Sequence, residues 1–442
     1  MTKVSSRAWR ADALVAALWW VGAAAIGLFI AGGGLTTTSP VDYLYSLARM
    51  AGIAAAVLVM NQVLLISRVP WIERVLGHDR AAATHMRMGK VAFILMLVHA
   101  GLIIIMSAHY DGRSVFAEIP ALWDLGWFVV TAQVALGFFT LVVATSLLIV
   151  RRRWRYETWH TVHLFVYVAI ALVVPHQFIQ GSTFQSKGFA WWFWLALYVI
   201  TFGSWLAFRV LRPLFIARRH GLVVSEVAKN PDGSTSIVMT GSDVHLLGAQ
   251  AGQFMLWRFL GAGYWREAHP FSLSRAPSRD SLRITVKPSG DGSSALATLP
   301  VGTRVLAEGP LGVFTHGART RPGVVFVAAG IGITPLRAML ENPPAGPCDI
   351  VLRAPSKKAM PLRAEVLKLA KISGATVHEF YGPRGFGWST VAEPTKLASL
   401  IDDLEQRDVY ICGPVAWADA VETDALSSGV APEAIHRERF GW

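Results

Sequence analysis

The stretch "GKVAFILMLVHAGLIIIMSAHY", residues 89–110, is almost entirely apolar and carries a histidine, His99, near its middle. A helix that crosses a bilayer needs about 20 apolar residues, so this stretch is predicted to span a membrane. His85 lies fourteen residues upstream, where the same helix would enter the bilayer. Fourteen residues of α-helix rise about 21 Å and complete nearly four turns. The stretch therefore predicts one helix face that presents two imidazoles at two depths.

A second apolar stretch, residues 157–179, also carries a histidine pair. His163 and His176 are thirteen residues apart, a spacing that does not share a face on a straight helix. Pro175 stands directly before His176 and is expected to kink the helix. His160 is an alternative to His163, although its sixteen-residue distance to His176 matches the other helix less well.

Polar side chains are costly in hydrocarbon unless they have partners, so these histidines are predicted to face one another. The matching depths pair His85 with His163 at an inner site and His99 with His176 at an outer site. A single membrane histidine is more often a hydrogen-bonded packing residue, but two pairs at matching depths favour metal ligands. Haem iron accepts two axial nitrogens and places an apolar ring between helices. The four histidines are therefore predicted to hold two b-type haems.

The composition separates a membrane half from a water-soluble half. Of the 442 residues 53% are hydrophobic and only 16% charged, and the long apolar runs end near residue 211. The predicted spanning helices are residues 11–31, 43–66, 88–108, 123–150, 157–179 and 189–210. The two cysteines, Cys348 and Cys412, are too few for a four-cysteine zinc or iron–sulfur site.

The net charge of +12 is concentrated in short loops between the apolar runs, which indicates membrane topology and not nucleic-acid binding. One set of loops holds Lys3, Arg7, Arg10, Arg68, Arg74, Arg80, Arg87, Arg151, Arg152, Arg153, Arg155, Arg209, Arg212, Arg218 and Arg219. The opposite loops hold only Arg113 and Lys187. The positive-inside rule then predicts a multi-pass protein of the cell membrane whose termini and soluble half are cytoplasmic.

The soluble half divides into two patterns. Short β-type runs separated by Gly, Pro, Asn and Asp occupy residues 216–318 and predict an antiparallel barrel. Residues 320–442 alternate buried strands with helical stretches, which predicts a parallel-sheet nucleotide-binding domain. The fold class is thus a six-helix membrane domain, residues 1–212, followed by a barrel and an α/β domain.

Two glycine-rich stretches have the character of phosphate-binding loops. In "KPSGDGSSALATLP", residues 287–300, which Lys287 opens, the candidates are Gly292, Ser293 and Ser294, since backbone amides at a helix start favour phosphate. An ordinary capped helix is the alternative. In "AAGIGITPL", residues 328–336, Gly330 and Gly332 allow close backbone approach, and Thr334 and Pro335 open a helix.

The stretch "HPFSLS", residues 269–274, resembles the flavin-binding segment of the ferredoxin–NADP reductase superfamily. More narrowly, it resembles the segment of ferric reductases and NADPH oxidases. The resemblance covers most of the chain, because that family also has six helices and paired histidines at these spacings. It implies FAD bound at His269, Pro270, Phe271 and Ser272.

The resemblance also implies a route for hydride. "YICGP", residues 410–414, is similar to the family's segment beside the nicotinamide, so Cys412, Gly413 and Pro414 are expected there. A buried structural cysteine is the alternative. Family members end with an aromatic residue that shields the flavin. Phe440 is the better match and Trp442 the other candidate; simple packing is the alternative for both.

The electron donor and the acceptor are less defined by the sequence. Arg353 follows a strand and could hold the 2′-phosphate of NADPH, but a solvated basic loop is equally compatible, so NADH stays possible. Arg49 could provide positive charge for a haem propionate or for superoxide. Animal oxidases of this family carry a further histidine where this chain has Ile103.

The expected activity is transfer of electrons from cytoplasmic NADPH through FAD and two haems to an extracytoplasmic acceptor. Oxygen and ferric chelates are equally favoured as that acceptor. Alternatives are a conduit to quinone or a periplasmic protein, a flavin reductase tethered by a haem-free anchor, and a transporter with a regulatory nucleotide-binding domain. The sequence leaves the oligomeric state open.

Overall fold

The structure is a computed structural model of the chain. It describes residues 3–36, 39–147, 154, 156–185, 188–261, 268–288, 291–343, 345–385 and 387–439. Phe440 and Trp442, the predicted flavin-shielding residues, lie outside the described residues. The chain forms two compact units: one is Met1–Arg10, Pro70–Asp79 and Val210–Trp442, and the other is Ala11–Val69 and Arg80–Arg209.

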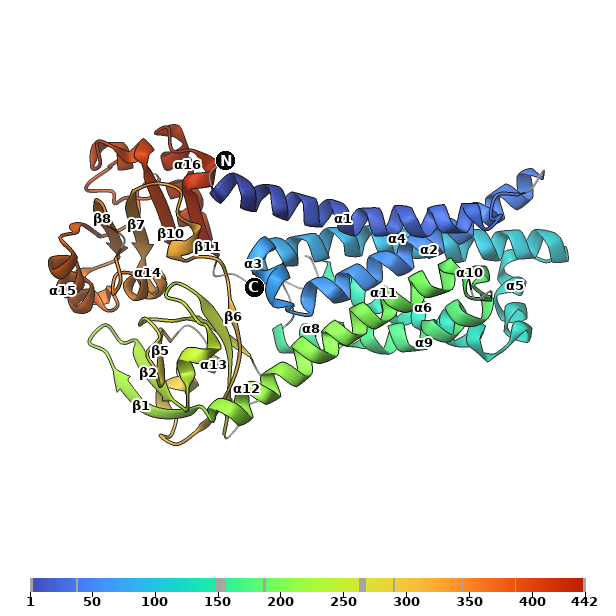
Figure 1. The fold of residues 1–442 in the computed structure, drawn as a ribbon, viewed down its shortest axis with the longest axis horizontal. Helices are drawn as coiled ribbons and strands as arrows, with labels where there is room; N and C mark the ends of the chain where they lie inside the picture. The colour runs from blue at the N-terminus through green and yellow to red at the C-terminus, as the bar shows by residue number, and fades with distance from the viewer. Residues whose placement is uncertain are drawn as a thin grey trace. The chain divides into compact units, whose positions relative to one another are not determined.

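The membrane unit consists of helices, as predicted (Figure 1). The helices from the N-terminus to the barrel are α1 Lys3–Ala31, α2 Pro40–Ile66, α3 Pro70–Leu76, α4 His78–Asp111, α5 Val115–Ala121, α6 Trp127–Ser146, α8 Tyr156–His163, α9 Phe165–Gln180, α10 Ser182–Gln185, α11 Phe189–Ser204, the π-helical η2 Trp205–Leu211 and α12 Arg212–His220. Six helical stretches among the described residues are long and apolar enough to cross a bilayer. The predicted six-helix architecture is therefore confirmed.

The histidine helix near residue 160 is divided. α8 ends at His163, Leu164 interrupts the helix, and α9 begins at Phe165 and contains Pro175. The sequence analysis expected a kink at Pro175; the structure has Pro175 inside α9 and a one-residue turn at Leu164.

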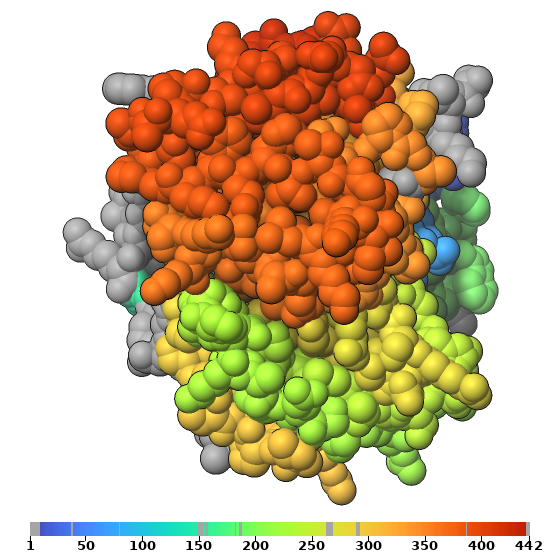
Figure 2. Space-filling model, turned by 90° about the vertical axis from the view of Figure 1, so that its left-hand side faces the viewer, coloured from blue at the N-terminus to red at the C-terminus, as the bar shows by residue number. Residues whose placement is uncertain are grey.

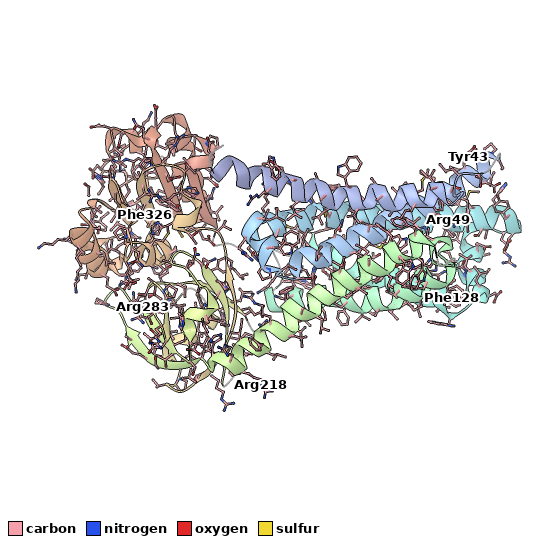
Figure 3. The ribbon with its side chains drawn as sticks, in the orientation of Figure 1. Tyr43, Arg49, Phe128, Arg218, Arg283 and Phe326 are labelled. Atoms are coloured by element: carbon pink, nitrogen blue, oxygen red, sulfur yellow. The ribbon has the colours of Figure 1, made fainter. Side chains whose placement is uncertain are left out.

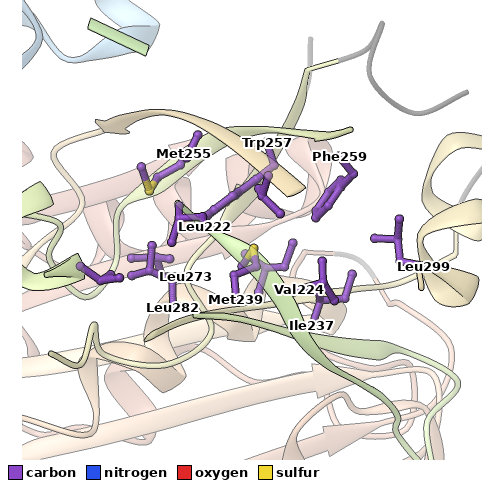
Figure 4. Packing of buried hydrophobic residues seen from close by; sticks show 14 of the residues in the cluster. Leu222, Val224, Ile237, Met239, Met255, Trp257, Phe259, Leu273, Leu282 and Leu299 are labelled. Atoms are coloured by element: carbon purple, nitrogen blue, oxygen red, sulfur yellow. The ribbon is translucent and has the colours of Figure 1, made fainter. Parts of the chain in front are cut away.

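The barrel is an antiparallel six-stranded sheet of order β4-β3-β6-β1-β2-β5. Its strands are β1 Val223–Lys229, β2 Thr235–Thr240, β3 Phe254–Leu260, β4 His269–Ser272, β5 Ser281–Val286 and β6 Arg304–Leu311. Trp257, Phe259 and Ile237 are fully buried in its core (Figure 4). Burying each such side chain contributes about 1.5–3 kcal/mol, so this core fixes β3 and, through it, the paired strand β4. The predicted antiparallel barrel is confirmed.

The α/β domain has a parallel sheet of order β11-β10-β7-β8-β9. Its strands are β7 Gly323–Ala329, β8 Cys348–Ala354, β9 Thr376–Tyr381, β10 Arg407–Gly413 and β11 Ile435–Arg439, and its helices are α14 Ile333–Met339, α15 Arg363–Ser373 and α16 Val415–Ser427. β7 and β10 are buried along their whole lengths because both faces of a parallel sheet are covered. The carboxyl ends of all five strands meet at one edge, where nucleotides bind in such folds.

A network of ion pairs joins the barrel to the α/β domain, which lie side by side in Figure 2. Arg283 of β5, labelled in Figure 3, contacts Glu365 of α15 with an N–O distance of 2.8 Å. Arg337 contacts the same carboxylate at 2.8 Å and also pairs with Glu341. Glu341 in turn accepts a hydrogen bond from the backbone N–H of Ala276, at 2.8 Å. The network holds the two folds together within one unit.

Asp408 fastens the connection between barrel and α/β domain to the parallel sheet. The side chain is fully buried and accepts hydrogen bonds from the backbone N–H groups of Thr320 and Arg321, at 2.8 and 2.6 Å. It also contacts His436 Nε2 at 2.7 Å. Burial by itself raises the pKa of Asp408, but these hydrogen bonds outweigh burial and hold the pKa below its ordinary value.

We expect Asp408→Asn to lower the free energy of unfolding of this unit by about 3 kcal/mol, because it breaks a buried charged network. Since the folded-state pKa is lowered, the stabilisation is complete above the ordinary value of about 3.9 and decreases as the pH falls through the folded-state pKa. Thermal denaturation of the purified full-length protein at several pH values would measure the loss of stability in Asp408→Asn. The difference between wild type and variant should shrink below about pH 4. The exposed Asp402→Asn is the control; an equal effect there would contradict the assignment.

Candidate functional site

The outer histidine pair lies at an apolar cavity of the membrane unit. The ring centroids of His99 and His176 are 6.2 Å apart, with an interplanar angle of 58°. Both rings line a cavity of about 330 Å³, together with Gly52, Ile103 and other mostly apolar residues. The structure therefore brings the predicted outer pair together, one ring from α4 and one from α9.

The ring orientation of His99 is set by a hydrogen bond to α2. Its Nδ1 lies 2.9 Å from the backbone carbonyl oxygen of Ala48. A carbonyl oxygen can only accept, so Nδ1 carries the proton and Nε2 is left with a free lone pair. His176 Nδ1 is buried and has no hydrogen-bond partner among the described residues. Fixing one ring nitrogen by a backbone carbonyl is how metal-ligating histidines are usually held.

The inner pair has the same geometry. The ring centroids of His85 and His163 are 6.2 Å apart, with an interplanar angle of 59°. His85 Nδ1 lies 3.4 Å from the carbonyl oxygen of Gln62, and His163 Nδ1 lies 3.3 Å from Ser146 Oγ. The Ser146 hydroxyl already donates to the Val142 carbonyl at 2.6 Å, so it accepts from His163. In His85 the carbonyl of Gln62 can only accept, so Nδ1 carries the proton and Nε2 keeps its lone pair.

The two pairs fit haem better than a metal bound by protein alone. Among the residues that the structure describes, no group of three or more His, Cys, Asp or Glu side chains could hold a metal ion. Each pair could supply two nitrogens to a metal whose other ligands come from a cofactor such as a porphyrin. Metal–imidazole bonds of about 2.0–2.1 Å on opposite sides of one metal atom place ring centroids about 6 Å apart. The buried, unpaired His176 Nδ1 lies beside the space that this group would fill.

Arg49 is the one cationic side chain among the described residues that line the outer cavity (Figure 3). Its guanidinium lies 4.9 Å from the ring centre of Phe29 and 5.7 Å from that of Tyr45. Cation–π contacts of this kind are worth about 0.5–2 kcal/mol and hold the charge in place. No carboxylate lines the described part of the cavity.

The predicted flavin segment forms strand β4, paired with β3. Ser272 is buried, and its Oγ has no hydrogen-bond partner among the described residues. Buried hydroxyls are normally paired, so this atom fits a position beside a hydrogen-bonding ligand. His269 and Phe271 stack with ring centroids 5.8 Å apart, and Pro270 lies between them in the chain. These contacts fit a planar cofactor along β4.

The first glycine-rich stretch forms a very short helix. Gly292, Ser293 and Ser294 lie in α13, Asp291–Ala295, shortly after Lys287 at the end of β5. Residues 289 and 290 lie outside the described part of the chain. The glycine and serines do open a helical turn, and their contact with phosphate stays a prediction.

The second glycine-rich loop packs against the "YICGP" segment. Gly330 has φ of +53°, which favours glycine. A Cβ on Gly332 would lie 2.2 Å from the carbonyl oxygen of Cys412, and one on Gly413 would lie 2.6 Å from the Trp417 ring. Thr334 Oγ1 donates to the Ile331 carbonyl at 3.0 Å, and Pro335 is buried in α14. Gly332 is therefore required by backbone packing between two motifs far apart in sequence.

Cys412 is the second-last residue of β10 and is fully buried. Burial, and then the charge of Glu438, raise the pKa of its thiol, so the thiol is uncharged. Glu438 lies opposite Cys412 in the parallel pair β10–β11. The sequence analysis missed Glu438, because only the strand register brings it beside Cys412. Pro414 immediately follows and precedes α16.

Arg353 lies at the nucleotide edge of the sheet with a second arginine that the sequence analysis missed. Arg353 Nη2 donates to the Gly382 carbonyl at 3.1 Å, and Arg384 donates to the Ala416 carbonyl at 2.9 Å. Burial and the charge of Arg384 lower the pKa of Arg353. Neither guanidinium forms an ion pair with a carboxylate in the described structure, whereas Arg363 pairs with Glu379 at 2.6 Å.

Comparison with known proteins matches the two units separately. Residues 51–174 match the family described as "Ferric reductase like transmembrane component". The chain is 30% identical over 220 residues to the Flavohemoprotein of Vibrio cholerae serotype O1, covering 47% of this chain and 55% of that protein. It is 29% identical over 214 residues to the ferredoxin–NAD(+) reductase component of the Xanthobacter autotrophicus alkene monooxygenase system, covering 46% and 62%. The chain spans about half the length of the curated relatives it matches.

Solved structures include the "Flavohem-like-FAD/NAD Binding Domain of Nitric Oxide Dioxygenase" from Vibrio cholerae O1 biovar El Tor, at 29% identity and a TM-score of 0.42, covering 50% of this chain and 98% of that one. The chain joins a ferric reductase-like membrane domain to a reductase-type unit. This fused architecture matches that of the ferric reductase and NADPH oxidase family, which its motifs resemble.

Substituting Gly332 by alanine should weaken nucleotide binding, because the new Cβ would overlap the Cys412 carbonyl and separate the two loops. Overpacking costs about 1–3 kcal/mol, which corresponds to a roughly 5- to 150-fold rise in the KM for NADPH. Steady-state kinetics with the full-length protein would measure the rise. Gly317→Ala is the matched control, since its Cβ would approach only Thr315 Oγ1, at 3.4 Å. An unchanged KM in Gly332→Ala would refute the packing role.

Proposed function

We propose that the protein is a transmembrane NAD(P)H-dependent oxidoreductase that moves electrons from cytoplasmic NADPH, via FAD and two stacked b-type haems, to an acceptor outside the cytoplasm. The proposal rests mainly on the two histidine pairs, His85 with His163 and His99 with His176. Each places two imidazole rings 6.2 Å apart, one from α4 and one from α8 or α9. The membrane match over residues 51–174 includes three of the four histidines.

The chain's own residues position and insulate the cofactors. When bound, FAD accepts a hydride and haem iron carries single electrons. Backbone carbonyls and Ser146 orient the imidazoles, and the apolar lining of the outer cavity excludes water. In the proposed arrangement Ser272, whose buried Oγ has no partner among the described residues, would hydrogen-bond the flavin, and the uncharged Cys412 would lie beside the nicotinamide.

The proposed orientation rests on charge. Among the loops between the predicted spans, the Arg- and Lys-rich ones lie on the side of the membrane where the last span leads into the soluble unit. By the positive-inside rule, that side, with both termini and the soluble unit, would be cytoplasmic. The outer pair would then lie near the extracytoplasmic surface.

The proposed acceptor is oxygen, giving superoxide, or a ferric chelate. Arg49 would stabilise an anion or a haem propionate at the outer cavity. Ile103, also at the cavity, stands where animal oxidases have a histidine, which argues against a specialised oxygen site of that kind. Transfer to quinone or to a periplasmic protein is the second candidate, and a transporter would require that no haem is bound.

His99→Ala and His176→Ala should each abolish far-side reduction while NADPH-to-flavin transfer persists, because each removes a ligand of the outer haem only. Stopped-flow absorbance of the purified protein separates the two steps. His109→Ala, at the exposed end of α4, is the control and should behave as wild type. A purified wild-type protein with no Soret absorption, or far-side reduction that survives both substitutions, would overturn the proposed function.

NADPH is the proposed donor because Arg353 and Arg384 lack carboxylate partners in the described structure and lie at the nucleotide edge. Losing a charge-assisted hydrogen bond costs about 1.5–3 kcal/mol, so Arg353→Ala should lower kcat/KM for NADPH roughly 10- to 150-fold. Turnover with NADH, which lacks the 2′-phosphate, should stay unchanged. The exposed Arg279→Ala is the control. Equal losses with both nucleotides would contradict a 2′-phosphate role.

A further inference from the structure

Two of the histidines of α4, His85 and His99, point a ring nitrogen at a backbone carbonyl of α2. His85 approaches the Gln62 carbonyl and His99 approaches the Ala48 carbonyl. The two carbonyls are fourteen residues apart, as are the two histidines, and the order is reversed because the helices are antiparallel. The two contacts are therefore equivalent positions of one helix pair, and any difference between them comes from the local residues.

The outer contact is short because residue 52 is a glycine. In α2 the Ala48 carbonyl lies beside residue 52, its partner one helical turn later. A second donor can reach that oxygen only by passing close to the position of the residue 52 side chain. A Cβ on Gly52 would lie 2.8 Å from His99 Nδ1, 3.0 Å from Cε1 and 3.1 Å from Cγ. Any other residue there would displace the imidazole.

The inner contact lacks this arrangement. One turn after Gln62 stands Ile66, which has a branched side chain, and the contact of His85 Nδ1 is 3.4 Å instead of 2.9 Å. N–H···O hydrogen bonds weaken beyond about 3.2 Å. Gly89, four residues after His85 in α4, does not have the role of Gly52. Its Cβ would meet only the end of the flexible Gln62 side chain, at 2.8 Å, and no histidine.

We propose that Gly52 is a positioning residue that gives the outer iron ligand, His99, a stronger Nδ1–H hydrogen bond than the inner ligand, His85, receives. The inference rests on the proposed function, since it requires haem at both pairs. A stronger hydrogen bond from Nδ1–H makes the opposite ring nitrogen more basic. A more basic axial ligand stabilises ferric iron and lowers the reduction potential. Gly52 thereby makes the outer site a stronger reductant toward the final acceptor.

The test compares Gly52→Ala with Gly137→Ala in the full-length, haem-loaded protein. A Cβ on Gly137 meets no atom within 4 Å, so this variant controls for the change of glycine to alanine in a membrane helix. Spectroelectrochemical titration measures both haem potentials. We expect a positive shift of the outer potential in Gly52→Ala, or loss of the outer haem alone. In Gly137→Ala and in Gly89→Ala both potentials should match wild type.

Wild-type protein provides a second measurement should Gly52→Ala fail to accumulate. The ring angles of the two pairs are nearly equal, 58° and 59°, so ring orientation does not distinguish the two haems. Electron paramagnetic resonance should then show a smaller largest g value for the outer haem, identified as the signal lost in His99→Ala. Identical g values, an unmoved outer potential in Gly52→Ala, or an equal shift in Gly89→Ala would overturn the inference. Absence of haem from wild type would instead refute the proposed function.

Discussion

A ring nitrogen of an imidazole inside a bilayer needs a hydrogen-bond or metal partner, and the contact of α4 with α2 provides one for His85 and His99. A polar group in hydrocarbon costs several kcal/mol when it has no partner. On α4 the Nδ1 atoms of His85 and His99 contact carbonyls of α2, although those carbonyls also belong to a helix. The same two rings lie 6.2 Å, centroid to centroid, from His163 and His176 respectively. These two sets of contacts connect α2, α4 and the α8–α9 segment.

The soluble unit depends on close approach between backbones. The loop after β7 and the end of β10 touch at Gly332 and Cys412, and the neighbouring Gly413 contacts Trp417. The contact brings together the carboxyl ends of β7 and β10, which are adjacent in the parallel sheet. Arg353 and Arg384 lie at the same edge of the sheet, with backbone carbonyls as their described hydrogen-bond partners. At this edge of the sheet, uncharged backbone lies beside the buried Cys412 thiol, and the positive charges are those of Arg353 and Arg384.

Much of this arrangement could be predicted from residue patterns. Apolar length gave the six spans, and depth gave the pairs His85–His163 and His99–His176, whose rings the structure brings together. What the sequence could not give were contacts that depend on register between distant segments. Glu438 lies opposite Cys412 only because β11 pairs with β10 in one register, and Arg384 lies near Arg353 only because β9 follows β8 in the sheet. No glycine or proline marks the one-residue turn at Leu164 in the sequence.

The reason that a particular glycine is required could not be predicted from the sequence. Gly330 and Gly332 lie two residues apart in one motif, yet one adopts a left-handed backbone and the other avoids a carbonyl. Gly52, in an otherwise ordinary apolar helix, admits an imidazole to a backbone oxygen. In each case the missing Cβ is required by a neighbour that is remote in the sequence or by local φ, and composition cannot tell these causes apart. A glycine in a membrane helix is therefore informative about function only when its neighbour is known, and at residue 52 that neighbour is a predicted iron ligand.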